Sequence, residues 1–183
     1  GLAERLLERR RRAGGGQALR LSLDHRRVAV QPQVAEQFGD ACREAQGGGL
    51  LIGVDLVKDK VLLDAAYDDP LQVTAAFNRN LLRRLNRLLG CDADVADFDH
   101  VAFYEPRQQR IEMHLQARRA LTLRWPGGQR ALAAGERIHT ENSYKHTVEG
   151  FAGLLRDAGF GAVRHWTDPQ HWFAVFWAAA APA

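Results

Sequence analysis

The sequence predicts an α/β protein in which part of a doubly wound sheet is interrupted by an α+β insertion from about residue 60 to 140. Residues 50–57 form a nearly continuous apolar run, which is typical of a parallel strand buried on both faces. Residues 110–117 alternate strictly between apolar and polar, which predicts a half-buried antiparallel strand. Helical spacing over residues 148–158, followed by two short apolar runs, predicts a helix and a hairpin at a sheet edge.

The composition is that of an ordinary globular domain. The chain has 183 residues, of which 46% are apolar and 26% charged, enough for one domain with a buried core. No apolar run reaches the roughly 18–20 residues that a membrane-spanning helix needs. Cys42 and Cys91 are too few and too isolated for a disulfide framework or a zinc site. We therefore expect a cytoplasmic protein with free thiols.

The formal net charge of +3 arises within residues 1–46, a basic segment without a lasting hydrophobic pattern. An arginine run at residues 9–12, with Arg26 and Arg27, is the only feature that favours nucleic-acid binding. The rest of the chain is electrically neutral and carries no folded basic motif, so we expect neither a nucleic-acid nor a membrane partner. His114, His139 and His146 have no metal-ligand spacing, so no metal ligand is predicted.

Two helices are expected after the first strand. Residues 60–67 predict a short helix that Asp68, Asp69 and Pro70 stop. Thr74 is expected to cap a second helix that Gly90 ends, with three arginines facing solvent. The predicted buried stripe of that helix consists of Phe77, Leu81, Leu85, Leu88 and Leu89.

The middle and the end of the chain predict strands. Residues 101–104, 110–117 and 121–125 indicate an antiparallel meander packed on a helix, with a turn at 126–128. The polar run at 138–145 is expected to be a loop. A helix over 148–158, capped by Gly159, should precede strands at 162–166 and 171–177, which residues 167–170 join.

Several motifs resemble one known family. They are residues 53–59 (Gly-Val-Asp-Leu-Val-Lys-Asp), 66–69 (Ala-Tyr-Asp-Asp), 73–78 (Val-Thr-Ala-Ala-Phe-Asn) and 138–145 (Ile-His-Thr-Glu-Asn-Ser-Tyr-Lys). Together they resemble the histidine-specific, S-adenosylmethionine-dependent methyltransferases that trimethylate the amino group of free histidine on the route to ergothioneine. The resemblance runs from about Gly48 to Phe176, the carboxyl-terminal part of a longer family chain.

The resemblance implies a methyltransferase with S-adenosylmethionine as cofactor, free L-histidine as substrate and two structural parts. Residues 47–59 and 144–183 are expected to form elements of a Rossmann-like methyltransferase sheet, and residues 60–143 an α+β substrate-binding domain. Residues 1–46 carry no motif of the family.

Five site residues follow from the resemblance. Tyr67 is expected to contact the main-chain amino-acid group of the substrate, and Met113 to lie near its imidazole. Glu141 and Ser143, with Asn142 between them, are expected to hydrogen-bond the imidazole ring. From the residues alone, Tyr67 could instead end a helix, Met113 could be core, and Asn142 or Ser143 could cap the helix near residue 148.

The glycine-rich strand–helix turn and the ribose-binding acid of the family are not found in residues 1–46. The triple glycine at 14–16 follows an arginine run, not an apolar strand, so no cofactor-binding residue is predicted. No catalytic side chain is predicted either, because methyl transfer from a sulfonium needs alignment rather than a protein nucleophile. We expect a truncated gene product. The alternative is an inactive remnant, or an amino-acid-binding fragment that lacks the cofactor site.

Overall fold

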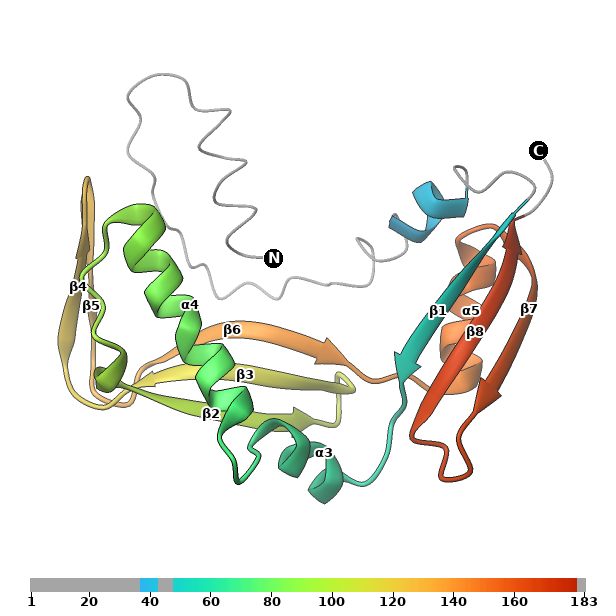
Figure 1. Ribbon diagram of the computed structural model, residues 1–183, viewed down its shortest axis with the longest axis horizontal. Coiled ribbons are helices and arrows are strands. Elements are labelled where there is room, and N and C mark those ends of the chain that lie inside the picture. The colour runs from blue at the N-terminus through green and yellow to red at the C-terminus, as the bar shows by residue number, and fades with distance from the viewer. Residues whose placement is uncertain (1–36, 43–47, 181–183) are drawn as a thin grey trace. The chain divides into compact units, whose positions relative to one another are not determined.

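The structure is a computed structural model that describes residues 37–42 and 48–180, which form a mixed α/β arrangement with three small sheets (Figure 1). These residues divide into two compact units. The first holds Val61–Glu105 and Ile111–Ser143, and the second holds the described residues up to Lys60, Pro106–Arg110 and those from Tyr144 on. The expectation for residues 1–36 lies outside the described part of the chain.

The first unit combines two helices with two sheets. Strands β2, β3 and β6 form one sheet in the order β2-β3-β6, and β4 pairs with β5 in a separate hairpin (Figure 1). The predicted strand at 110–117 and the turn at 126–128 are therefore confirmed, although the expected meander is split between two sheets. The elements are α3 (Lys60–Tyr67), α4 (Val73–Leu89), η1 (Val95–Asp97), β2 (Phe98–Glu105), β3 (Arg110–Ala117), β4 (Leu121–Trp125), β5 (Gly128–Leu132) and β6 (Arg137–Tyr144).

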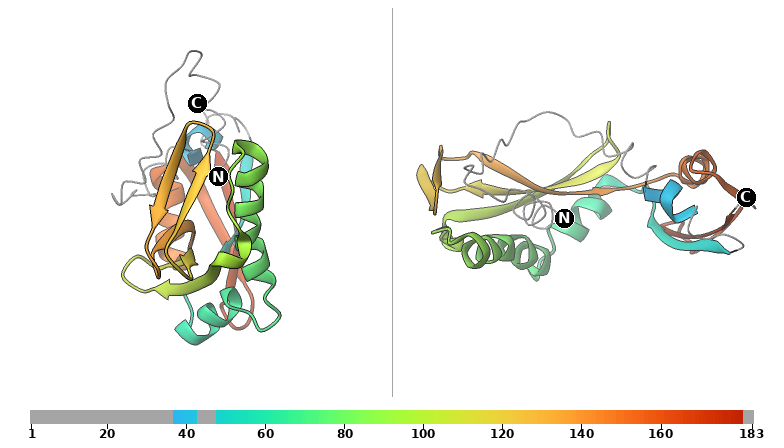
Figure 2. Two further views of the ribbon diagram at one scale, coloured as in Figure 1. Left: turned by 90° about the vertical axis from the view of Figure 1, so that its left-hand side faces the viewer. Right: turned by 90° about the horizontal axis from the view of Figure 1, so that it is seen from above.

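Helix α4 lies along one face of the β2-β3-β6 sheet, as the view from above in Figure 2 shows. Its buried residues are Ala75, Asn78 and Leu82, whereas Phe77 is 64% exposed. The predicted apolar stripe was therefore wrong about the buried face. The reason is that a polar residue sits on that face: the Asn78 side chain donates to the His114 carbonyl (3.0 Å) and contacts His100 Nδ1 (2.9 Å).

The start of α4 is capped differently from the prediction, whereas its end is as predicted. The carboxylate of Asp69 accepts hydrogen bonds from the backbone N–H groups of Val73 and Thr74, both at 2.9 Å. The capping side chain is thus Asp69, not Thr74, because a carboxylate four or five residues upstream here reaches the free N–H groups of the first turn. Gly90 ends the helix with φ +66°, which glycine adopts without strain.

The polar run that predicted a loop at 138–145 forms most of strand β6 (Arg137–Tyr144). Its exposed and less exposed residues alternate through Asn142, as in a half-buried strand. The helix that follows is capped by Thr147, whose hydroxyl accepts from the Gly150 N–H at 3.0 Å. The alternative role of Asn142 or Ser143 as helix caps is therefore wrong.

The second unit is a three-stranded sheet with one helix. The strands β1 (Gly49–Asp55), β7 (Phe160–Thr167) and β8 (Phe173–Ala180) lie in the order β1-β8-β7, and β8 is antiparallel to both neighbours. The expected helix and hairpin at the sheet edge are thus confirmed. Helix α5 (Val148–Asp157) buries Phe151 and Leu155 against Phe176 and its neighbours in β8.

The prediction that β1 is a parallel strand buried on both faces was wrong. β1 pairs with β8 in antiparallel register, from Gly49 opposite Ala179 to Asp55 opposite Phe173, and Leu51 is 66% exposed. An apolar run reports strand propensity but not strand direction. On the face of the sheet where Gly49 and Leu51 lie, an aromatic ring covers part of the backbone, because a Cβ at Gly49 would meet the Trp177 ring at 2.7 Å.

Two further features complete the second unit. Residues 37–42 are helical, and Phe38 packs edge-on against Phe151 with ring centroids 5.8 Å apart, so part of the basic segment joins this core. At the turn between β7 and β8, the Asp168 carboxylate accepts from the N–H groups of Trp172 and Phe173 (2.8 and 2.7 Å). Among the described helices of both units, none is long and apolar enough to cross a membrane.

Candidate functional site

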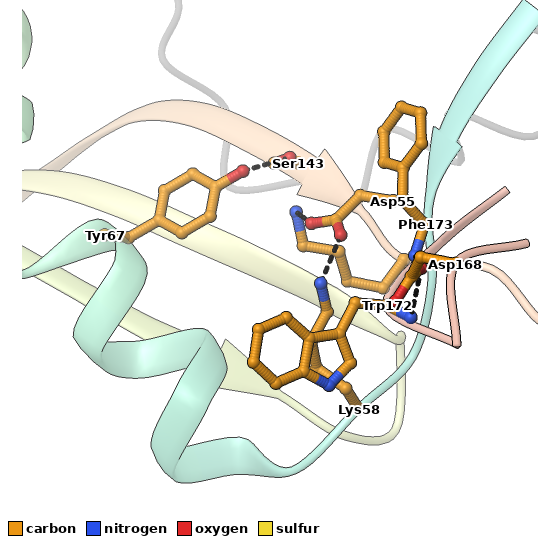
Figure 3. A network of polar contacts seen from close by, with 8 residues as sticks. Asp55, Lys58, Tyr67, Ser143, Asp168, Trp172 and Phe173 are labelled. Atoms are coloured by element: carbon orange, nitrogen blue, oxygen red, sulfur yellow. Dashed lines mark hydrogen bonds and ion pairs between the residues drawn. The ribbon is translucent and has the colours of Figure 1, made fainter. Parts of the chain in front are cut away.

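A hydrogen bond joins two of the motifs that predicted the site. Tyr67, the last residue of α3, and Ser143, near the end of β6, lie 76 positions apart in the chain. The phenol oxygen of Tyr67 is 2.7 Å from the hydroxyl oxygen of Ser143, and either group can donate (Figure 3). The fold therefore brings together these two predicted substrate-binding residues.

Tyr67 is held in place by polar contacts from α3 to β2. The Asp64 carboxylate accepts from the Tyr104 N–H at 2.7 Å, which ties the helix to the strand. His100 Nε2 lies 2.8 Å from the Tyr67 carbonyl, and that carbonyl can only accept. His100 therefore carries a proton on Nε2, and its Nδ1 accepts from Asn78 at 2.9 Å. These hydrogen bonds hold the carboxyl end of α3, and with it the Tyr67 backbone, against β2.

Met113 lies in the core beneath Tyr67. It is buried with Leu63, Tyr104 and Ile111, and Tyr67 packs against this cluster. The Thr140 hydroxyl donates to the Met113 carbonyl at 2.9 Å, which adds a side-chain bond between β6 and β3. Met113 is therefore a core residue next to Tyr67, and its place near a substrate imidazole stays a prediction.

Asn142 and Glu141 differ in burial although they are neighbours in β6. The side-chain carbonyl oxygen of Asn142 is buried and has no hydrogen-bond partner among the described residues. Such an acceptor is costly unless a ligand or water donates to it. Glu141 is exposed, and strand alternation places it on the side of β6 that His139 and Ser143 share. Within the described part of the chain, no hydrogen bond or ion pair joins the Glu141 side chain to Tyr67 or Met113.

The second unit contains a separate polar cluster around Asp55, at the end of β1. Lys58 Nζ lies 2.5 Å from the Asp55 carboxylate (Figure 3). Lys145 Nζ lies 2.8 Å from the same carboxylate, and the Lys145 side chain is fully buried. Burial raises the pKa of Asp55, but hydrogen bonds and charges from Lys145 and Lys58 outweigh this and lower it. No functional role was predicted from the sequence for Asp55 or Lys145, since no local pattern marks a buried lysine.

Comparison with known proteins identifies the family. The sequence profile described as histidine-specific methyltransferase, SAM-dependent, matches residues 24–180. The chain belongs to this family. The match begins upstream of Gly48, where the resemblance was expected to start, so residues 24–46 also contribute to it.

Two curated members of the histidine-specific methyltransferase family are similar to the chain. A histidine N-alpha-methyltransferase of Mycolicibacterium smegmatis is 46% identical over 131 residues, covering 70% of this chain and 41% of the relative. One of Mycobacterium tuberculosis is 42% identical over 143 residues, covering 73% and 42%. The chain thus spans about two fifths of the length of these relatives.

The family cofactor, S-adenosylmethionine, can be tested against the described residues. An acid at the carboxyl end of a sheet strand is a common partner for a cofactor ribose. Asp55 occupies such a position in β1, but it is engaged by two lysines at 2.5 and 2.8 Å. Asp55 is therefore not assigned to the cofactor ribose, and no other described residue is assigned to this cofactor.

The backbone of His146 pairs with β1, and its ring supports a prediction about pH. Burial, and then the charge of Lys145, lower the pKa of His146 below its ordinary value of 6.5. The unfolded chain takes up this proton near pH 6.5 and the folded chain only at lower pH, so acidification favours unfolding. We expect the free energy of unfolding to fall from pH 7 to pH 5.5, measured by urea denaturation.

The control for this prediction is a second histidine in the same unit. His146→Gln should flatten the change between pH 7 and pH 5.5, whereas His165→Gln, at an exposed position of β7, should leave it intact. An unchanged pH dependence in His146→Gln would contradict the assignment.

Proposed function

We propose that the protein containing this chain transfers methyl groups from S-adenosylmethionine to the α-amino group of free L-histidine, in the cytoplasm and on the route to ergothioneine. The family match and the names of the two relatives support the reaction and the substrate. The observation that carries the proposal is the Tyr67–Ser143 hydrogen bond of 2.7 Å, which joins the two motifs assigned to the substrate.

In this proposal the first unit is the α+β substrate domain, inserted into a Rossmann-like methyltransferase sheet to which β1, β7 and β8 belong. The separation of the described residues into two compact units near residues 60 and 143 supports the insertion. The β1-β8-β7 sheet, with α5 packed against it, supports an α/β layer for the second unit.

The proposed roles follow the chemistry of histidine. Tyr67 offers a hydroxyl to the amino-acid group, and Met113 packs near the imidazole. Glu141 accepts a hydrogen bond from one ring nitrogen and Ser143 binds the other, so both edges of the ring are satisfied. The buried side-chain carbonyl oxygen of Asn142, which has no hydrogen-bond partner among the described residues, supports a ligand or water that donates to it.

The amine of a free amino acid is mostly protonated at neutral pH and must lose its proton before it can attack a methyl group. The residues of this chain contribute by holding histidine in one orientation and by excluding water around it. An amino acid without imidazole nitrogens would leave the polar partners unpaired, which costs orders of magnitude in selectivity. Phenylalanine should therefore be rejected.

The test of this function uses a chimera, because the chain spans only 41% of the Mycolicibacterium smegmatis relative. The residues of that relative outside the match are joined to this chain, and methylated histidine is measured by mass spectrometry. Tyr67→Phe and Ser143→Ala should each raise the KM for histidine about tenfold, the value of roughly one hydrogen bond. Tyr144→Phe, a matched change at a tyrosine that accepts from Arg110 at 3.0 Å, should leave the KM unchanged.

The outcomes separate the function from the alternatives. A chimera that binds histidine but transfers no methyl group would favour an amino-acid-binding fragment. An equal KM in Tyr67→Phe, Tyr144→Phe and the parent chimera would contradict the assigned role of Tyr67.

A further inference from the structure

Strands β3 and β6 bring together two imidazoles and a carboxylate that are far apart in sequence. One ligand atom each from Glu112, His114 and His139 lies within 4.8 Å of the other two. Glu112 and His114 are two positions apart in β3, so they share the face opposite Met113. His139 comes from the neighbouring strand β6. No metal-ligand spacing marks this group in the sequence, because strand pairing brings its members together.

We propose that Glu112, His114 and His139 bind a divalent ion of the zinc class. Two histidines and one carboxylate are a donor set that Zn²⁺ and Co²⁺ accept readily, with a further position open to water. The proposal does not rest on the function proposed above, because none of its three ligands is among the five proposed site residues.

The distance between His114 and Glu112 suits two ligands of one ion better than a direct hydrogen bond. His114 Nε2 and Glu112 Oε2 are 3.6 Å apart, longer than a hydrogen bond between these atoms. Donors at about 2.0–2.1 Å from a tetrahedral ion lie roughly 3.3 Å from one another. This pair is therefore already near the spacing that coordination requires, and a small rotation of the exposed His139 side chain would bring in the third donor.

The surroundings orient the two rings. The His114 ring is 8% exposed and lies between Phe103 and His139, with ring centroids 5.5 Å and 4.7 Å away. His139 Nε2 lies 3.1 Å from the Glu141 carbonyl, which favours a proton on that nitrogen and leaves the lone pair on Nδ1. A ring oriented by a backbone carbonyl through its other nitrogen is the usual arrangement of a histidine ligand.

The charge of the group favours a cation as well. The Glu112 side chain is only 15% exposed, and its carboxylate would supply a negatively charged ligand atom to a bound cation. On the same face, Arg137 is turned to Gln116, with Nε 2.8 Å from the amide oxygen. A bound ion would link β3 to the edge strand β6, because its ligands come from both strands.

The experiment is a titration of the chain with CoCl₂, followed by visible absorption, in the absence of histidine and of S-adenosylmethionine. We expect one saturable site per chain, and ZnCl₂ should displace the cobalt and bleach the spectrum. His139→Ala, at an exposed position, should weaken cobalt binding at least tenfold, and Glu112→Gln should do the same while keeping the shape of the side chain.

The matched control is His165→Ala, an exposed strand histidine in the second unit, which should bind cobalt as the parent chain does. No saturable cobalt spectrum, or parent-like binding by both His139→Ala and Glu112→Gln, would overturn the proposal. Because no methyl transfer is measured, failure here leaves the enzymatic proposal unaffected, and failure of that proposal leaves this one unaffected.

Discussion

Asp55→Asn is expected to lower the free energy of unfolding by about 3 kcal/mol, measured by urea denaturation at pH 7. The reason lies with Lys145, whose side chain is fully buried 2.8 Å from the Asp55 carboxylate. Removing the carboxylate leaves a buried ammonium without its charged partner, which usually costs about 3–5 kcal/mol. Since the Asp55 side chain is 32% exposed, we expect the lower end of that range.

Two further variants test this explanation. Lys58→Ala removes the other lysine of Asp55, which is only three positions away, and should cost about 1 kcal/mol or less. Combining Asp55→Asn with Lys145→Met removes the fully buried charge together with its partner and should recover much of the loss. A loss in Asp55→Asn no greater than in Lys58→Ala would show that Lys145 does not depend on Asp55.

Glu141→Ala should reduce kcat/KM for histidine at least a hundredfold in the chimera, the largest change expected of the five proposed site residues. A site that hydrogen-bonds a polar group of its substrate loses several orders of magnitude when the pairing fails. The Glu141 carboxylate is exposed on β6, so the free protein spends little energy in presenting it to a ligand. The rates are measured from methylated histidine at several substrate concentrations.

The comparison for this variant is a second exposed acid. Glu149→Ala, in the first turn of α5, should leave kcat/KM unchanged. Glu141→Gln should fall between the parent and Glu141→Ala, because an amide oxygen can still accept a hydrogen bond but carries no charge. Parent-like turnover by Glu141→Ala would remove Glu141 from the binding site.

The parts of the fold that depend on local pattern could be predicted from the sequence. Strand β3 was predicted within its observed bounds, because alternation over Arg110–Ala117 reflects one buried face. Helix α4 was predicted to end at Gly90, because glycine tolerates the left-handed conformation there. Motif resemblance supplied Tyr67 and Ser143, and the structure joins them by a hydrogen bond.

The parts that depend on distant partners could not be predicted. Asn78 is buried because His100 and the His114 carbonyl satisfy its amide, and neither partner is close to it in the sequence. The run at 138–145 is polar enough for a loop, yet it becomes an edge strand because β3 offers it backbone partners. Lys145 is buried because Asp55, 90 positions earlier, neutralises it.

The placement of aromatic rings over glycines in the β1-β8-β7 sheet gives this protein a built-in optical probe. The chain has four tryptophans, of which Trp166, Trp172 and Trp177 belong to the second unit and Trp125 to the first. A Cβ at Gly49 would meet the Trp177 indole at 2.7 Å, so this indole covers the backbone of β1. Three of the four tryptophans lie in the second unit, so intrinsic fluorescence should follow mainly the melting of that unit.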